Sequence, residues 1–219
     1  MLRHVPQLIN LFATLILLLS FAMISQRRIG SLINLFMMQG AALVAASWLL
    51  AYATQQPDLV WSGALTLLLK VVFIPWMLQR LIRKLNVRWD VETLINIPTT
   101  MLVGIALVIF AFGLALPVSR LSHSMAGGSL GIALACVLLA FMMMITRSKA
   151  VPQVIGFLSM ENGLIFAATT ATNGMPMIVE FGIALDVLVG VLILGVFMFQ
   201  IREKFDSLDI HHLESLRED

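Results

Sequence analysis

Long apolar runs separated by short polar breaks make up most of this chain. The runs are about 18–25 residues long, which is enough for an α-helix to cross the hydrocarbon of a bilayer. They lack the strict alternation of a membrane β-strand, and backbone groups in hydrocarbon must pair within their own segment, so each run predicts a helix. We predict seven spans: Gln7–Ser25, Gly30–Thr54, Leu59–Gln79, Thr99–Leu116, Ser129–Thr146, Pro152–Ala171 and Met177–Gln200.

The composition indicates a single membrane domain. Only 12% of the 219 residues are charged, which is about half of the roughly 25% that is usual in soluble domains. The sequence therefore predicts an all-α integral membrane protein without a second, soluble domain. Within residues 1–219 we expect a first three-helix unit at 1–79 and an amphipathic connector with a linker helix at 80–128. A second three-helix unit follows at 129–204, and a tail at 205–219.

Basic residues lie mostly on one side of the predicted spans, and they set the expected orientation. The side onto which the first, third, fifth and seventh spans open carries Arg27, Arg28, Arg80, Arg83, Lys84, Arg88, Arg147, Lys149, Arg202, Lys204 and Arg217. The opposite side carries only Arg3 and Arg120. Because cytoplasmic loops are rich in lysine and arginine, we expect an outside N-terminus and a cytoplasmic C-terminus.

The segment Arg80–Pro98 is amphipathic, because Leu81, Leu85 and Trp89 recur every four residues among charged positions. Two interpretations stay open. In the first, the segment has a binding role and either lies flat on the inner membrane surface or docks a cytoplasmic partner. In the second, it is only a solvated connector with one tryptophan anchor.

The first three spans resemble the last three. The second span contains Met37-Met38-Gln39-Gly40 and the sixth contains Met160-Glu161-Asn162-Gly163, and each follows a short basic loop. Units four spans apart point the same way, so the pattern indicates a parallel repeat with the fourth span as a linker. In this alignment Met38 occupies the place of Glu161.

Three ionisable side chains, Lys70, Glu161 and Asp186, lie near the middle of predicted spans. A charge at that depth costs a few kcal/mol on insertion scales, and such residues usually face other helices or water and mark ion or proton routes. A structural role, as a fixed ion pair or as inert hydrogen-bonded acids, is the alternative. For Lys70, such a pair could also join a neighbouring subunit.

The two acids are expected at similar depth on adjacent helices, because a tight turn at residues 173–176 joins the sixth and seventh spans. Asn162 follows Glu161, and Gly182 and Gly190 flank Asp186 at four-residue spacing, which lets a helix or water come close. A pair of this kind can pass protons.

Pro75 lies five residues after Lys70 and is expected to kink the third span, which could open a hydrated pocket beside the lysine. No metal or cofactor is expected. The single cysteine, Cys136, cannot build an iron–sulfur or zinc site. All four histidines lie outside the spans, which argues against haem.

With these residues identified, the whole chain resembles the E-type membrane component of hydrogenase-4, a group 4 [NiFe] hydrogenase of the formate hydrogenlyase type. Its last three spans are similar to the K-type subunit of complex I and to the C-type subunit of Mrp antiporters. Gly156 and Asn162 match the frame of that small family, Leu158 takes the place of its glutamate, and Glu161 lies three residues further along.

In the next span, Asp186 and Gly190 match the family's carboxylate and glycine. The resemblance implies a non-catalytic, multi-pass subunit of a bacterial inner-membrane complex, beside antiporter-like subunits. There it would contribute to a mid-membrane proton or ion path and brace its neighbours, while the redox metals belong to cytoplasmic hydrogenase subunits. Two alternatives remain: a purely structural assembly subunit and a small independent ion transporter.

Overall fold

The computed structural model describes residues 5–85, 95–121, 127–172 and 190. Apart from short connections, these residues are helical and form no strand beyond a single bridge. The elements are α1 (Val5–Ser25), α2 (Ile29–Thr54), α3 (Pro57–Thr66), the π-helical segment η2 (Leu67–Phe73), α4 (Ile74–Leu85), α5 (Ile97–Leu121), α6 (Gly127–Thr146) and α7 (Ala150–Thr172).

Six helices of the described residues are long and apolar enough to cross a membrane. They correspond to the first six predicted spans, with α3, η2 and α4 joined end to end as the third. The predicted all-helical architecture is thereby confirmed for the described residues, with six helices suited to crossing a membrane. The seventh predicted span, Met177–Gln200, lies outside the described residues except for Gly190, so the total of seven and the orientation stay predictions.

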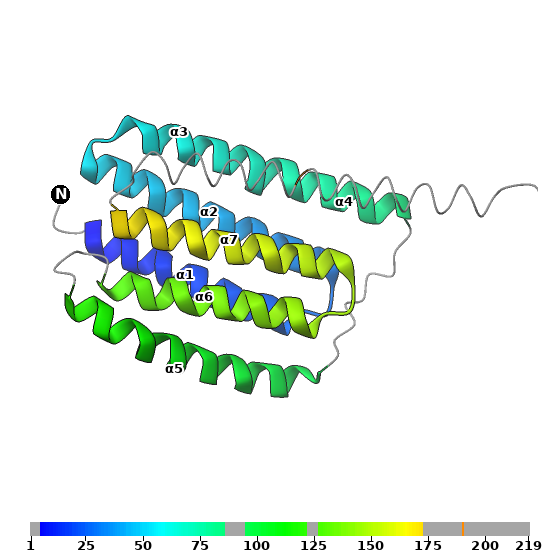
Figure 1. Ribbon diagram of the computed structural model, residues 1–219. Helices are drawn as coiled ribbons and strands as arrows, with labels where there is room; N and C mark the ends of the chain where they lie inside the picture. The colour runs from blue at the N-terminus through cyan, green and yellow to red at the C-terminus, as the bar shows by residue number, and fades with distance from the viewer. Residues whose placement is uncertain (1–4, 86–94, 122–126, 173–189, 191–219) are drawn as a thin grey trace, which may run out of the picture.

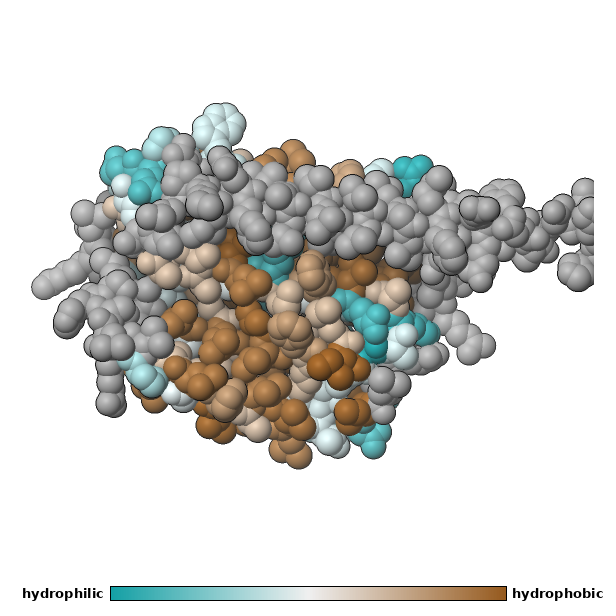
Figure 2. All heavy atoms as spheres, in the orientation of Figure 1, coloured by the Kyte–Doolittle hydropathy of each residue, from teal (hydrophilic) through white to brown (hydrophobic). Residues whose placement is uncertain are grey.

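The helices run side by side, and consecutive spans point in opposite directions (Figure 1). Four of them form the centre: α1 packs on α2 and α6, and α7 packs on α2 and α6. The rod made of α3, η2 and α4 lies along α2, and α5 covers α6 on the other side of the bundle. Figure 2 shows apolar surface across the middle of the visible face and most polar surface toward the ends, as a bilayer requires.

Two apolar clusters fill the centre of the bundle. One contains Phe36 and Leu139, and the other contains Ile16, Leu43 and Phe166. Both draw on α1, α2, α6 and α7. Both clusters are therefore enclosed by the same four central helices, and a polar residue that points inward from any of them needs a polar partner.

The loops that join α1 to α2 and α6 to α7 meet at one end of the bundle, where Arg28 and Arg147 are bridge residues. The Arg147 side chain turns inward, with 2% of its surface exposed. Its Nη2 donates to the carbonyl oxygens of Ile24, at 2.5 Å, and Met23, at 3.4 Å. Burial lowers the pKa of this guanidinium from its ordinary value, yet arginine stays charged. It therefore caps the carbonyl end of α1 with positive charge.

The structure describes only the two ends of the predicted amphipathic connector, Arg80–Pro98. Residues 80–85 continue α4 beyond the apolar span instead of starting a separate segment. The rest of the predicted connector, as far as residue 94, lies outside the described residues, and Ile97 and Pro98 open α5. Both interpretations of the connector, as a surface or docking segment and as a solvated linker with one tryptophan anchor, stay untested.

Candidate functional site

The structure brings together two of the three ionisable residues that lie near the middle of the predicted spans. Lys70 on η2 and Glu161 on α7 form an ion pair, with 3.2 Å between Nζ and Oε1. The same ammonium donates a hydrogen bond of 3.0 Å to Oδ1 of Asn162. Both charged side chains are enclosed, with Lys70 0% and Glu161 1% exposed. Lys70, whose partner the sequence could not identify, is thus paired within this chain.

The backbone at Lys70 is a π-helix, from Leu67 to Phe73. Pro75 follows closely. It has no N–H to donate, and in a regular α-helix its ring would clash with the carbonyl four residues before it. In the wider turns of a π-helix each backbone N–H donates to the carbonyl five residues back, as the N–H of Ile74 does to the oxygen of Leu69. The helix is thus locally widened just before the proline, and such π-helical turns are frequent at functional sites.

The rod approaches α2 closely at Lys70 because residue 40 is a glycine. A Cβ added to Gly40 would lie 3.3 Å from Cγ2 of Val71 and 3.6 Å from Cβ of Lys70. A larger side chain there would push η2 away from α2 and pull the ammonium from its partners.

We expect Gly40→Leu to lower the free energy of unfolding by about 1–3 kcal/mol, the usual cost of overpacking. Gly113→Leu in α5 is the matched control, because nothing lies within 4 Å of a Cβ at that position. Thermal unfolding of both variants in detergent measures the difference. Equal shifts would show that the close approach at Gly40 contributes nothing.

A chain of hydrogen bonds continues from Lys70 across the bundle to α1. Nδ2 of Asn162 donates to Oε1 of Gln39 at 3.2 Å. Nε2 of Gln39 donates to the Ser20 hydroxyl at 2.9 Å, and that hydroxyl donates to the carbonyl of Ile16 at 2.9 Å. Ser20, Gln39 and Asn162 are all buried. The chain links η2, α7, α2 and α1 at a level where each helix is otherwise apolar.

Lys70 determines how the amide groups along this series of hydrogen bonds are oriented. An ammonium only donates hydrogen bonds, so the oxygen of the Asn162 amide must face it and the NH₂ group must face away. The same logic orients Gln39. Every acceptor oxygen of the two amides is thus turned toward Lys70, and every donor is turned toward α1. The aligned amide dipoles stabilise a positive charge on Lys70, as the Glu161 carboxylate also does.

The amides orient charge but do not carry protons, because neither amide gains or loses a proton near neutral pH. Among the residues of the chain from Lys70 to Ile16, Lys70 is the only one with a readily ionisable side chain. Together with Glu161 it forms the ionisable part of the site.

Of the predicted site residues, Lys70, Glu161 and Asn162 come together, and Pro75 lies just after the π-helical segment that carries the lysine. Asp186 and Gly182 lie outside the described residues, so the predicted pair of acids is untested. Gly190 is described, in helical conformation, without a contact within 4 Å of an added Cβ.

Sequence reasoning missed the roles of Gln39 and Ser20. The repeat motif included Gln39 without assigning it a role, and Ser20 was not singled out. One signal for Gln39 was available, since the repeat alignment sets it opposite Asn162, and the two amides are indeed in contact. Ser20 gives no such signal, because a serine in an apolar helix can bond to its own backbone.

Leu158, at the place of the family's glutamate, is fully buried in an apolar cluster. It takes no part in the polar chain, which Glu161 and Asn162 enter from the same helix. In the described residues, no group of three or more histidine, cysteine or acidic side chains is placed to hold a metal ion. Cys136 is a buried free thiol that meets the Ser20 hydroxyl.

These features define a class: a multi-pass helical membrane protein whose interior holds a paired lysine and glutamate. The chain belongs to the family of an uncharacterized protein of Mycobacterium tuberculosis, Rv0085, with which it is 32% identical over 212 residues, 96% of each chain.

The chain is also distantly similar to hydrogenase-4 component E. It is 25% identical to that protein from Escherichia coli K12 over 215 residues, which cover 96% of this chain and 97% of the relative. The protein from Shigella flexneri gives the same figures. No family model matches the sequence, and no solved structure matches it either. The resemblance inferred from the sequence is thus supported as a distant one.

Proposed function

We propose that this chain is a non-catalytic membrane subunit of a hydrogenase-4-type complex and supplies part of a proton path at mid-membrane depth. Similarity to hydrogenase-4 component E along nearly the whole chain supports the type of complex. The enclosed pair of Lys70 and Glu161 carries the proposal of a path, because ionisable groups inside membrane helices commonly mark proton routes.

The location of the pair suits such a path. Glu161 lies eleven residues after the first residue of α7, about 16 Å along the helix, which is close to half of a hydrocarbon core of about 30 Å. We place the chain in the bacterial inner membrane, with its basic end cytoplasmic. Its neighbours there would be antiporter-like membrane subunits, with the hydrogenase subunits in the cytoplasm.

The pair can exchange a proton without creating net charge in the bundle. Transfer of one proton from Nζ of Lys70 to the Glu161 carboxylate converts two charged groups into two neutral ones. Lys70 can then take a proton from one side while Glu161 releases its proton on the other. The amides of Asn162 and Gln39 do not carry protons, so the proposed path does not continue toward α1. We propose that it continues toward Asp186 instead.

A structural role is the second candidate, and a specific observation favours it. The same contacts join η2, α7, α2 and α1, so they also fix how these helices pack. Under this alternative, changes to the charged pair cost assembly of the complex before they change any ion movement.

The test compares Glu161→Gln and Asp186→Asn with Gln39→Met in inverted membrane vesicles that contain the assembled complex. The measured quantity is proton uptake per hydrogen molecule turned over. We expect both carboxylate variants to assemble and to lose most of this uptake. Gln39→Met should keep the wild-type ratio, because the amide branch carries no protons.

Three outcomes would contradict the proposal. Wild-type uptake in the assembled Glu161→Gln complex would remove the path. Loss of the subunit from the complex in the carboxylate variants, with coupling unchanged in whatever assembles, would favour the structural role. A chain that purifies without partner subunits and moves ions by itself would be an independent transporter.

A further inference from the structure

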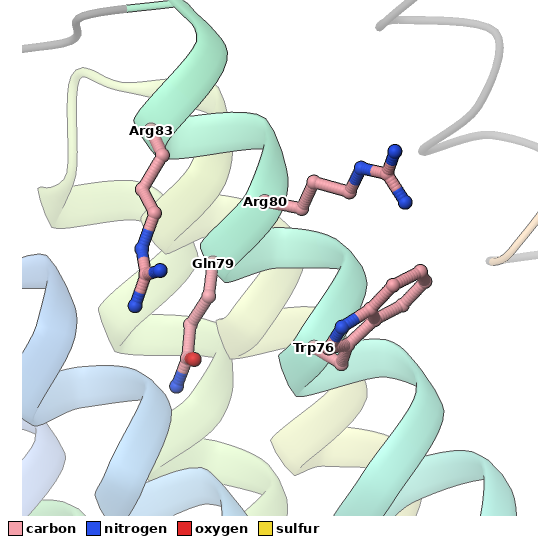
Figure 3. A pocket seen from close by; sticks show the side chains of 4 residues that line it. All are labelled: Trp76, Gln79, Arg80 and Arg83. Carbon is pink, nitrogen blue, oxygen red and sulfur yellow. The ribbon is translucent and has the colours of Figure 1, made fainter.

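One face of α4 carries a basic and aromatic stripe that the proposed proton path does not use. Trp76, Gln79, Arg80 and Arg83 line a pocket of about 460 Å³ among the described residues (Figure 3). Their spacing of three and four residues puts them on one side of the helix. Trp76 and both arginines are exposed.

The stripe has a defined internal geometry. The guanidinium carbon of Arg80 lies 5.2 Å from the centre of the Trp76 ring, a cation–π contact. Figure 3 shows these two side chains stacked on one flank, while Gln79 and Arg83 project together from the other. The tryptophan thus holds one guanidinium in place, and the second comes from the next turn of the helix. Guanidinium groups pair with phosphate through two parallel hydrogen bonds.

The location of the stripe indicates which kind of phosphate-containing compound it would bind. The apolar span ends at Arg80, so the stripe lies where headgroups meet hydrocarbon, the level that tryptophan and arginine prefer. The surface next to it on the hydrocarbon side is apolar, with Val72 and Phe73 exposed. A surface that is cationic at the headgroup level and apolar below it matches an amphiphile better than a soluble ion.

We propose that Trp76, Gln79, Arg80 and Arg83 form a binding site for an anionic phospholipid. Arg83 and Gln79 bind the phosphate group on one flank, Arg80 stacked on Trp76 adds positive charge on the other, and the acyl chains lie along Val72 and Phe73. This site is separate from the buried pair of Lys70 and Glu161, and it does not depend on the complex proposed above.

The test measures lipid binding to the full-length chain, together with any subunits that purify with it, in detergent. Phosphatidylglycerol and phosphatidylcholine are added in turn, and bound lipid is counted by native mass spectrometry. We expect a preference for phosphatidylglycerol. Arg80→Gln/Arg83→Gln should weaken its binding about twentyfold or more, since each basic residue near an anionic surface contributes roughly fivefold. Arg80→Lys should keep the charge but lose several-fold, because lysine lacks the planar group that stacks on Trp76.

Arg27→Gln/Lys149→Gln is the matched control, because it removes the same charge from the two loops at the same end of the bundle. It should change binding less than twofold. An equal loss in this control would mean general attraction to a basic surface and would overturn the site. So would displacement of the lipid by millimolar inorganic phosphate, equal binding of phosphatidylcholine, or crosslinks from the stripe to a carboxylate of another subunit in the lipid-containing complex.

Discussion

Lys70→Met should lower the free energy of unfolding by about 3–5 kcal/mol, because it leaves the Glu161 carboxylate in the bundle without its counter-charge. The double variant Lys70→Met/Glu161→Leu should recover most of that loss. Replacing both partners of a buried ion pair with apolar groups of similar size is often neutral, whereas removing one partner is costly. Denaturant or thermal unfolding in detergent measures both variants and the single variant Glu161→Leu.

Comparing the two single variants with the double variant measures the interaction between Lys70 and Glu161 apart from their contacts with other residues. If the two single changes simply add in the double variant, Lys70 and Glu161 are not coupled, and the 3.2 Å contact contributes nothing to stability. The result also bears on function. A double variant that folds and assembles but moves no protons would separate the structural role of the pair from its proposed proton exchange.

Arg147→Met should lower the free energy of unfolding by about 2 kcal/mol. The Arg147 guanidinium donates to the carbonyls of Ile24 and Met23 at the end of α1, and hydrogen bonds to a charged group contribute roughly 1.5–3 kcal/mol each. Methionine keeps the apolar stem but leaves these carbonyls without that donor. The loss of a buried charge offsets part of the cost, so the net effect is smaller than the two bonds together.

Arg27→Met is the matched control for this experiment, because Arg27 is exposed in the loop that follows α1. We expect a change below about 0.5 kcal/mol for it. Arg147→Lys should fall between the two, since one ammonium can reach one carbonyl. Thermal unfolding of the three variants in detergent decides the order. An Arg147→Met variant as stable as Arg27→Met would show that the cap is dispensable.

The spans were predictable from the sequence because hydrocarbon imposes a simple rule on length and polarity. Six of them could be compared with the structure, and their ends agree within a few residues except at α4 and α5. Both helices run past the apolar stretch, at Arg80 and at Leu116, because hydrogen bonding along a helix does not stop where hydrophobicity does.

The site was predictable in part. Burial cost alone singled out Lys70 and Glu161, since each charge in an apolar run needs a partner. The partner itself was not predictable, because spans far apart in the sequence meet only through packing, and the sequence contains no distance between η2 and α7. The role of Gln39 was underestimated for the same reason, because its hydrogen bond requires Asn162 to lie next to it in the folded bundle.

The π-helix at Lys70 also changes how the third span should be compared with relatives. A wide turn accommodates an extra residue, so a relative with one residue fewer between Leu67 and Phe73 could keep an ordinary α-helix there. In that relative, a lysine aligned with Lys70 would be rotated relative to the rest of the helix and would face a different neighbour. We therefore expect a single gap in an alignment of this segment to mark relatives in which a lysine at this position faces a different neighbour from that of Lys70.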